Sequence, residues 1–328
     1  MPSEQILTAS IPHNLAGQRL DQVLAELFSD YSRSKLQAWI KAGRVQIDGR
    51  QLPAKSRLEG GETVVLNAEP EAVVTVDAED IPLDIVYEDP FLLIVNKPAG
   101  LVVHPAAGNW DGTMQNALLH YNPGLAALPR AGLVHRLDKG TSGLMVVACT
   151  LKAHKYLVDE LQARTIKREY LAVVQGRMTA GGTVDQPVGR HSVDRKRIAV
   201  RDGGKPAVTH FRIEQRFSHH TLIRVNLETG RTHQIRVHMA HIRFPLVGDP
   251  VYGGRLRFPP GGDERLIEVL KGFNRQALHA AKLGLIHPQS GEWMEVEVEV
   301  PEDFARLLAV IRTTDSESRK HSQLPINT

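Results

Sequence analysis

The order of strand-like and helix-like segments after residue 81 constrains the fold most. Short apolar runs typical of strands occupy residues 91–95, 101–103, 144–148, 169–174, 208–213, 222–227 and 293–300. Helical spacing of apolar residues falls irregularly among them, at residues 114–120, 154–163, 232–241 and 304–311. This order lacks the regular strand–helix alternation of a parallel sheet. The sequence therefore predicts an α+β fold built on a mixed, mainly antiparallel sheet.

A smaller unit precedes this region. Apolar residues recur at helical spacing over residues 20–28 and 36–40, and a turn at Asp48-Gly49 follows a short strand near Val45. We expect a small α/β unit over residues 17–68, with residues 1–16 as an N-terminal extension. The predicted organisation continues with an acidic linker, a large domain and a disordered polar tail, over residues 69–80, 81–312 and 313–328.

The net charge of +3 hides an uneven distribution. Residues 69–89 hold eight acids and no base, so the remaining 40 bases and 29 acids balance at +11. This pattern favours a polyanionic partner, although a solvated charged surface gives the same composition. Cys149 is the single cysteine, which excludes an intrachain disulfide and a multi-thiolate metal site. Without a signal peptide or a membrane-length apolar run, we expect a cytoplasmic protein that does not bind membranes. The sequence gives no signal for the oligomeric state, and a monomer is the default expectation.

Residues 133–148 form the densest cluster of polar and small residues between apolar runs. Its one carboxylate, Asp138, lies in a turn, where an aspartate ordinarily binds backbone amides. Ser142 lies in GTSG, which lacks the G-x-S-x-G spacing of a hydrolase nucleophile. The segment also lacks the glycine and lysine spacing of a P-loop. Pattern alone gives this cluster no defined chemistry.

Residues 228–244 form a second polar cluster, in which three arginines alternate with three histidines. The members are Arg231, Arg236, Arg243, His233, His238 and His241. No thiolate or carboxylate accompanies the histidines within residues 231–248, and the guanidinium groups would repel a metal cation. We expect a helix whose basic face meets nucleic acid or Asp138. The alternative is that the histidines satisfy backbone groups while Arg236 and Arg243 lie at the surface.

Five long motifs then occur in order: NKPAGLVVHP, HRLDKGTSGL, KREYLAVV, GRTHQIRVHMAHIRFPLVGDPVYG and LHAAKLGLIHP. Together they resemble the RluA family of pseudouridine synthases over residues 81–300. RLDQVLAEL, SRSKLQAWI, GRVQIDG and LEGGETV resemble the S4 RNA-binding domain over residues 17–66. The resemblance implies the pseudouridine synthase fold with a central active-site cleft. It also implies an isomerase that acts on uridine in RNA without a cofactor or metal.

This reaction breaks the bond between N1 of uracil and C1′ of ribose and joins C5 to C1′. Cleavage develops positive charge at C1′, which one carboxylate can stabilise. The resemblance assigns that role to Asp138, with Arg231 as its ion-pair partner and Tyr170 against the uracil. Attack by Asp138 on C1′, attack on C6 and removal of a ribose proton all stay open.

The resemblance also implies the RNA contacts. It places Arg136 in the gap left by the flipped base, and the S4 helix on structured RNA. The expected RNA-binding residues there and on the basic segment 189–205 are Arg33, Lys35, Lys41, Arg44, Arg195 and Arg197. The implied partner is 23S rRNA or the large-subunit precursor, at clustered uridines of the subunit-interface stem-loop, with tRNA or another rRNA site as the alternative. A noncatalytic RNA-binding protein would share this surface but would tolerate the loss of Asp138.

Overall fold

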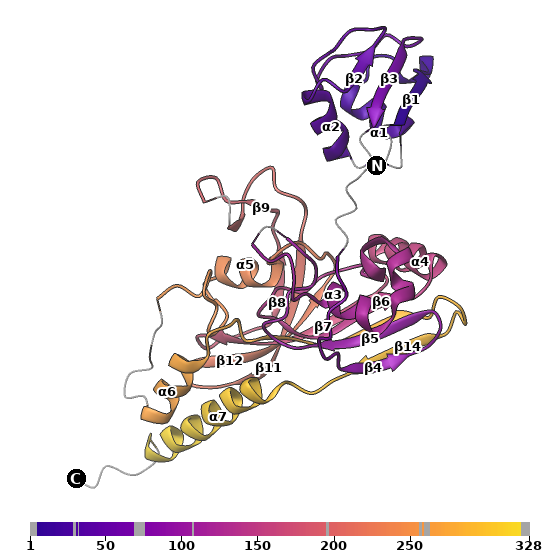
Figure 1. Cartoon of the computed structure of the whole chain (residues 1–328). Helices are drawn as coiled ribbons and strands as arrows, with labels where there is room; N and C mark the ends of the chain where they lie inside the picture. Colours follow the sequence, from indigo (N-terminus) through magenta and orange to yellow (C-terminus); the bar gives the residue numbers. More distant parts are fainter. Residues whose placement is uncertain are drawn as a thin grey trace, which may run out of the picture. The chain divides into compact units, whose positions relative to one another are not determined.

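The computed structural model describes residues 5–28, 31, 33–68, 76–106, 108–194, 197–255, 258 and 263–322. The chain divides into two compact units, Met1–Thr75 and Val76–Thr328. Figure 1 shows the strands and helices of each unit. Within the described residues, no helix is both long and apolar enough to cross a bilayer.

The N-terminal unit packs two helices on a three-stranded antiparallel sheet. Its elements are β1 (Gln5–Ser10), η1 (His13–Leu15), α1 (Leu20–Leu27), α2 (Arg33–Lys41), β2 (Val45–Ile47) and β3 (Thr63–Ala68). The strand order is β1-β3-β2. Leu20 and Leu24 of α1 and Leu36 of α2 are buried with Val64 and Leu66 of β3. The predicted helices and strands of this unit are confirmed.

The expected N-terminal extension over residues 1–16 is wrong for the part that the structure describes. Strand β1 pairs with β3 from Gln5 to Ser10, and Ile11 and Leu15 are buried in the same core. The alternating apolar residues of QILTASI therefore complete the sheet of this unit.

The C-terminal unit is built on one large twisted sheet. Its strands are β4 (Ile85–Glu88), β5 (Leu92–Lys97), β6 (Ser142–Ala148), β7 (Lys167–Gln175), β8 (Gly182–Asp185), β11 (Val208–Arg216), β12 (His220–Leu227), β13 (Leu278–Ile286) and β14 (Trp293–Glu297). They follow the order β4-β5-β6-β13-β7-β12-β11-β8, and β14 pairs with β13. The β6–β13 pair is parallel and the other named pairs are antiparallel. The predicted α+β fold with mainly antiparallel pairing is confirmed.

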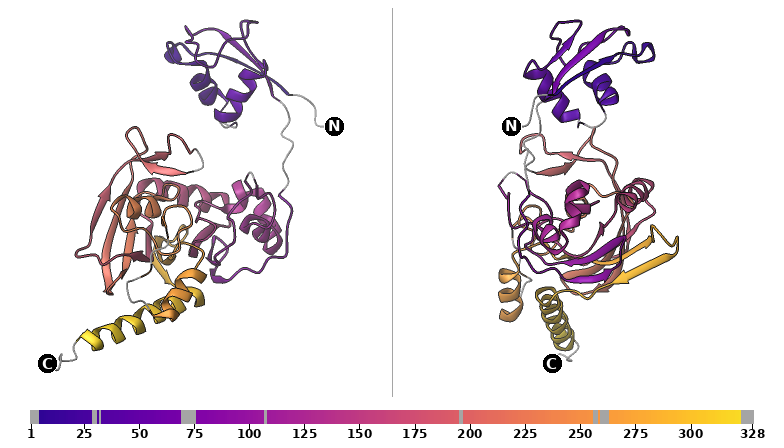
Figure 2. Two further views of the ribbon diagram at one scale, coloured as in Figure 1. Left: turned by 90° about the vertical axis from the view of Figure 1, so that its left-hand side faces the viewer. Right: turned by 45° about the vertical axis from the view of Figure 1, so that its right-hand side comes forward.

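Helices cover both faces of this sheet, as Figure 2 shows. They are α3 (Met114–Tyr121), α4 (Leu151–Ala163), α5 (Gln234–His241), α6 (Glu264–Gly272) and α7 (Glu302–Ser322), with short 3-10 helices η2 (Pro123–Ala127) and η3 (Pro129–Gly132). Successive residues of a strand face opposite sides. Tyr170 of β7 is buried with residues of α3 and α5, whereas its neighbour Leu171 packs with α6 and α7. Tyr170 therefore lies on the face that carries α5.

A separate hairpin projects beside α5. Strands β9 (Val188–Arg190) and β10 (Ile198–Val200) pair with each other and not with the large sheet. They pack over a small apolar cluster formed by Val188, Ala207 and Val237. This hairpin overlaps the basic segment 189–205, from which RNA contacts are expected.

Three boundary predictions need correction. Residues 101–103 are not a strand, because Val102 forms only an isolated bridge with Thr113. The tail predicted from residue 313 continues α7 to Ser322, and residues 323–328 lie outside the described residues. The linker residues 69–75 also lie outside them. The end of the predicted linker belongs to the C-terminal unit, since Asn116 donates to the carbonyl of Asp77 and Gly112 donates to Glu79.

Candidate active site

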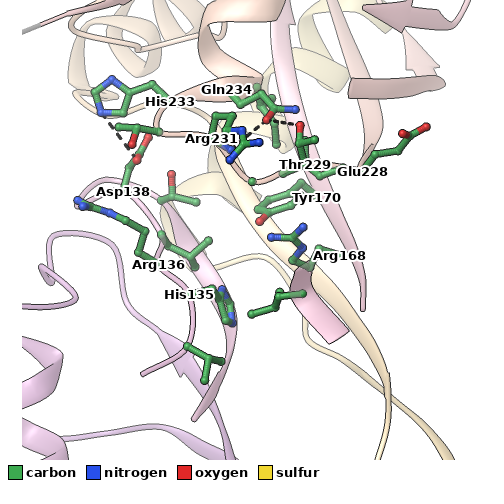
Figure 3. Close-up of a pocket in the computed structure, with 18 of the residues that line it drawn as sticks. His135, Arg136, Asp138, Arg168, Tyr170, Glu228, Thr229, Arg231, His233 and Gln234 are labelled. Atoms are coloured by element: carbon green, nitrogen blue, oxygen red, sulfur yellow. Dashed lines mark hydrogen bonds and ion pairs between the residues drawn. The ribbon is translucent and has the colours of Figure 1, made fainter. Parts of the chain in front are cut away.

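A pocket of about 560 Å³ opens on the α5 face of the large sheet. Its lining residues come from η3 and the loop after it, from α4, from β7, from the segment that joins β12 to α5, and from the start of β13. Six lining arginines are Arg130, Arg136, Arg164, Arg168, Arg231 and Arg236, against the two carboxylates Asp138 and Glu228. Figure 3 shows Asp138 beside His233 at one side of the view, with Tyr170 and Arg168 at the other. The excess of guanidinium groups suits a polyanionic ligand.

Asp138 lies in the loop that enters β6. The preceding residue, Leu137, is buried in the core, and Thr141 donates its backbone N–H to the carbonyl of Asp138 over 3.0 Å. This anchoring fixes the loop on both sides of the carboxylate. The side chain itself is 16% exposed, so it reaches the pocket while most of its surface is covered.

Arg236 is the ion-pair partner of Asp138. Its Nη1 lies 2.9 Å from Asp138 Oδ2, while its Nε and Nη2 donate to the two oxygens of Asp249 over 2.7 and 2.9 Å. Asp249 is fully covered, and it also accepts the backbone N–H groups of Val251 and Tyr252. The bidentate pair with Asp249 fixes the plane of the guanidinium, and in that plane Nη1 points at Asp138.

The predicted Asp138–Arg231 pair is therefore wrong. Arg231 lines the same pocket but donates from Nε to the carbonyl of Pro206 over 3.3 Å. Gln234 fixes this turn, because its side-chain oxygen accepts from the backbone N–H of Arg231. Helix α5 then begins, and its first turn directs Arg236 toward Asp138. The expectation that this helix presents a basic group to Asp138 is confirmed, and its surface alternative for Arg236 is wrong.

Lys97 holds the loop of Asp138 in place through hydrogen bonds. Its role was not predicted from the sequence. Its ammonium group is completely buried and donates to the carbonyls of Pro98, Leu101 and Lys139. Burial lowers its pKa to about 7, although Asp138 acts in the opposite direction. Lys97 thus joins the loop after β5 to the loop that carries Asp138. The sequence feature that could have identified Lys97 is a lysine at the end of a strand that begins with four apolar residues.

Tyr170 closes the floor of the pocket. Its side chain is buried with the core, and burial raises the pKa of its hydroxyl. Two residues earlier on β7, Arg168 also lines the pocket, and its buried Nε has no hydrogen-bond partner within the part of the chain that the structure describes. The ring of Tyr170 therefore gives the pocket a flat, neutral surface on the side away from Asp138, and Arg168 adds a positive charge there.

Glu228, the second lining carboxylate, is already engaged. It lies 2.7 Å from His210 Nε2 and 3.3 Å from Arg164 Nη1. Asp138 differs because, among the described residues, its Oδ1 has only a long contact of 3.8 Å, with Nε2 of His233. Asp138 is therefore the carboxylate with an oxygen available to a ligand.

The other predicted contact residues lie in three places. Arg136 is exposed and lines the pocket, whereas Arg197 is exposed on the β9–β10 hairpin. Arg195 lies outside the described residues. Four predicted RNA-binding residues belong to the N-terminal unit, at α2 or just after it: Arg33, Lys35, Lys41 and Arg44.

Two of these α2 residues are tied to their own unit. Arg33 pairs with the buried carboxylate of Asp21 over 2.8 Å, and Lys35 lies over the ring of Trp39 at 4.7 Å. These contacts hold the guanidinium group of Arg33 and the ammonium group of Lys35 in place within the N-terminal unit. Lys41 is exposed and Arg44 is half-buried.

The serine hydrolase alternative has no support in the geometry. Ser142 Oγ lies 3.0 Å from His279 Nδ1, but both side chains are buried and neither lines the pocket. His238 is also internal, with its two ring nitrogens at hydrogen-bond distance from Thr209 and from the carbonyl of Gln186. Within the described residues, no group of three or more possible ligands is placed to hold a metal.

Comparisons with known proteins agree with this geometry. Residues 91–241 match the family model described as RNA pseudouridylate synthase, and residues 18–64 match the S4 domain model. The chain is 57% identical over 304 residues to ribosomal large subunit pseudouridine synthase D of Pseudomonas aeruginosa, covering 93% of this chain and 95% of that protein. It is also 57% identical to the Escherichia coli K12 protein of the same name, over 96% of each chain.

Solved structures show the same fold. Human RNA pseudouridylate synthase domain containing 4 aligns with a TM-score of 0.55 at 23% identity, over 70% of this chain and 92% of that one. Human RNA pseudouridylate synthase domain containing 1 aligns with a TM-score of 0.54 at 24% identity, over 79% and 99% of the two chains. The architecture built on the large sheet is therefore one that known proteins share.

Proposed function

Because this chain belongs to the RNA pseudouridylate synthase family and is an isomerase, we propose that its substrate is 23S rRNA within the large ribosomal subunit precursor. The proposed targets are the clustered uridines of the subunit-interface stem-loop, whose modification supports assembly of the subunit. The two bacterial relatives named above are ribosomal large subunit pseudouridine synthases, and this chain matches nearly the whole length of each. The enzyme would act as a monomer in the cytoplasm, where ribosomal precursors are made.

One observation carries the assignment of the chemistry. Asp138 offers a free oxygen in an arginine-rich pocket, while its other oxygen is held by Arg236 and through it by Asp249. A fixed carboxylate beside C1′ stabilises the positive charge that develops when the N1–C1′ bond breaks. Uracil is then turned so that C5 joins C1′, and the proton on C5 is lost as N1 gains one. No atom enters from outside, so the pocket has to keep the uracil in place.

The neighbouring residues have roles that fit this sequence of events. Tyr170 presents a neutral phenol that can stack on the uracil and stay neutral, because burial raises its pKa. Arg136, two residues before Asp138, is exposed at the pocket and would fill the gap in the RNA stack. Taking a base out of a loop costs a few kcal/mol, and a stacked guanidinium offsets part of that cost.

Basic residues away from the pocket would bind the RNA backbone. Arg33, Lys35, Lys41 and Arg44 would contact structured rRNA from the S4 domain, and Arg195 and Arg197 from the hairpin segment. Phosphate contacts of this kind orient an RNA without choosing its sequence. Their contribution should weaken as the salt concentration rises, because binding releases counterions.

Mapping pseudouridines tests the substrate directly. A strain that lacks this gene should lose the clustered 23S pseudouridines, and the wild-type gene should restore them. A gene carrying Asp138→Asn should not restore them even though the protein accumulates. Unchanged 23S pseudouridines in the deletion strain, with losses in tRNA instead, would contradict the proposed substrate.

A further inference from the structure

Tyr252 joins the β9–β10 hairpin to the active site. Its hydroxyl oxygen accepts the backbone N–H of Ile198 in β10 over 3.0 Å and lies 2.8 Å from Nδ1 of His233. The guanidinium groups of Arg197 and Arg236 lie over its ring, 5.5 and 5.0 Å from the ring centre. The chemistry described so far gives no role to Tyr252 or to His233.

The hydrogen bonds around Tyr252 favour one form of His233. A backbone N–H can only donate, so the oxygen of Tyr252 accepts from Ile198 and keeps its own proton for another partner. Nδ1 of His233 is that partner when it carries no hydrogen. Burial lowers the pKa of His233, which favours the neutral ring despite the nearby carboxylate of Asp138. A neutral ring that accepts at Nδ1 carries its hydrogen on Nε2.

The position of Nε2 places that hydrogen in the pocket. Nε2 lies 3.8 Å from Asp138 Oδ1, which is too long for a hydrogen bond, and Figure 3 shows the two side chains facing each other. Both residues line the pocket. His233 also has a left-handed backbone, with a φ of 56°, which costs a non-glycine residue about 1 kcal/mol. Such strain persists where the surrounding structure holds a side chain in place.

We propose that Tyr252 holds His233 as the Nε2–H tautomer, so that His233 donates a hydrogen bond to the uracil detached beside Asp138. This inference rests on the proposed function. When the N1–C1′ bond breaks, its electron pair stays with the uracil, and the negative charge spreads over N1 and the carbonyl oxygens. A fixed neutral donor stabilises that charge, and His233 keeps its proton throughout. Tyr252 is a positioning residue, and Ile198 of the hairpin completes its hydrogen bonds.

The first test needs no turnover. In full-length protein labelled with ¹⁵N-histidine and free of RNA, NMR correlations between ring protons and nitrogens should show His233 as the Nε2–H tautomer. Tyr252→Phe should remove this preference and shift the ring nitrogen signals toward a mixture. A His233 found as the Nδ1–H tautomer, or one unchanged by Tyr252→Phe, would overturn the inference even if the proposed substrate is right.

The second test separates the loss of the hydrogen-bond donor of His233 from a structural effect of the substitution. Glutamine at position 233 can place an N–H near the position of Nε2, whereas asparagine reaches only as far as Nδ1 and tolerates the left-handed backbone. His233→Asn should lower kcat about 100-fold, as expected for the loss of one donor to developing charge, with an unchanged KM for RNA. His233→Gln should recover much of that loss. Equal kcat for wild type and His233→Asn would overturn the proposal.

A matched tyrosine serves as the control. Tyr87 donates its hydroxyl to Asp89 over 2.9 Å and does not line the pocket. Tyr252→Phe should lower kcat about tenfold, which corresponds to about 1.4 kcal/mol, while Tyr87→Phe leaves kcat unchanged. An equal loss of kcat in both variants would show that removing any tyrosine hydroxyl has this effect, and it would overturn the role of Tyr252. If Asp138→Asn kept its activity while the NMR result held, the proposed function would fail and the tautomer assignment would stand.

Discussion

At the scale of single residues, the site depends on one arginine shared by two aspartates. Asp249 binds Nε and Nη2 of Arg236, and Nη1 of the same group donates to Asp138. The arrangement orients Asp138, and it gives each carboxylate a cationic partner although Asp249 is fully covered and Arg236 nearly so. Removing one member of such a buried network leaves a charge without its partner, which is the costly case.

The two arginines of the GRTHQIR segment should therefore differ in effect. Arg236→Gln should lower kcat at least about 100-fold and destabilise the fold by about 3 kcal/mol, because Asp249 stays buried and unpaired. Arg231→Gln should change kcat by less than about tenfold and act mainly on KM for RNA. Steady-state kinetics with thermal unfolding checks both. Equal losses of kcat in the two variants would contradict the assigned pairing.

The choice between these arginines could not be made from the sequence. Both lie in the same motif, and helical periodicity shows only that one face is basic. The decisive features are the left-handed backbone of His233 and the contact between Gln234 and the backbone of Arg231. Asp138 and Tyr170 could be selected, because their motifs are long and the resemblance assigns them. Asp249 and Lys97 could not be selected from the sequence, because their roles depend on contacts with residues in other segments, Arg236 and Lys139.

His135, half-buried at the pocket wall, predicts how stability depends on pH. His135 accepts the backbone N–H of Val146 at Nε2, and burial lowers its pKa to about 3. Below pH 6.5 the unfolded chain binds a proton that the folded protein does not, so stability falls as the pH falls. From pH 6.5 to 5 this histidine should account for a loss of about 1.5 kcal/mol.

Urea unfolding at these two pH values checks this expectation. His135→Gln should reduce the pH dependence, whereas the exposed His241, changed to Gln, should leave it as in the wild type. A pH dependence that is unaffected by His135→Gln would contradict the assignment of a neutral ring to His135.

At the scale of elements, β13 holds the two halves of the large sheet together. It pairs with β6 on one side and with β7 on the other, and Leu278 at its start lines the pocket. Residues 278–286 are not among the strands expected from the sequence, because alanine, histidine and lysine interrupt the apolar pattern there. In a strand that is buried on both faces, apolar and polar residues do not alternate, so the two-residue period that indicates a half-buried strand is absent. The strands with longer β-branched and aliphatic runs were predicted.

Gly143 allows β6 and β13 to come close. Its φ is +111°, and a Cβ there would lie 2.2 Å from the carbonyl oxygen of Ala280. Gly143→Ala should destabilise the fold by at least about 3 kcal/mol, through both the clash and the strained backbone. Gly291→Ala, at a φ of +73° with open space around it, should cost only about 1 kcal/mol. Thermal unfolding measures both, and similar losses would contradict the close approach.

At the scale of the whole molecule, the chain is two folded units with separate hydrophobic cores. The prediction of two domains could be made from composition and motifs, but the start of the first unit could not. Its first strand is short and lies before the recognisable helices, so only its pairing with β3 identifies it. The pocket belongs wholly to the second unit, because every lining residue follows residue 76.

This division predicts separable functions. A protein that begins at Val76 should keep kcat on a short stem-loop within about fivefold, since the pocket is complete. Its affinity for structured 23S rRNA should fall at least about tenfold, or about 1.4 kcal/mol, because the S4 contacts are gone. Filter binding and single-turnover kinetics check the two parts. Equal affinity of the full-length and shortened proteins would contradict an RNA-binding role for the N-terminal unit.

The most direct measurement is pseudouridine formation by purified Asp138→Asn on a 23S stem-loop, with RNA binding measured on the same sample. The side chains are nearly the same size, and the amide oxygen can still accept from Arg236, so the protein should fold and bind RNA as the wild type does. We predict that no pseudouridine forms. Turnover near the wild-type rate would contradict the claim that the carboxylate of Asp138 performs the chemistry.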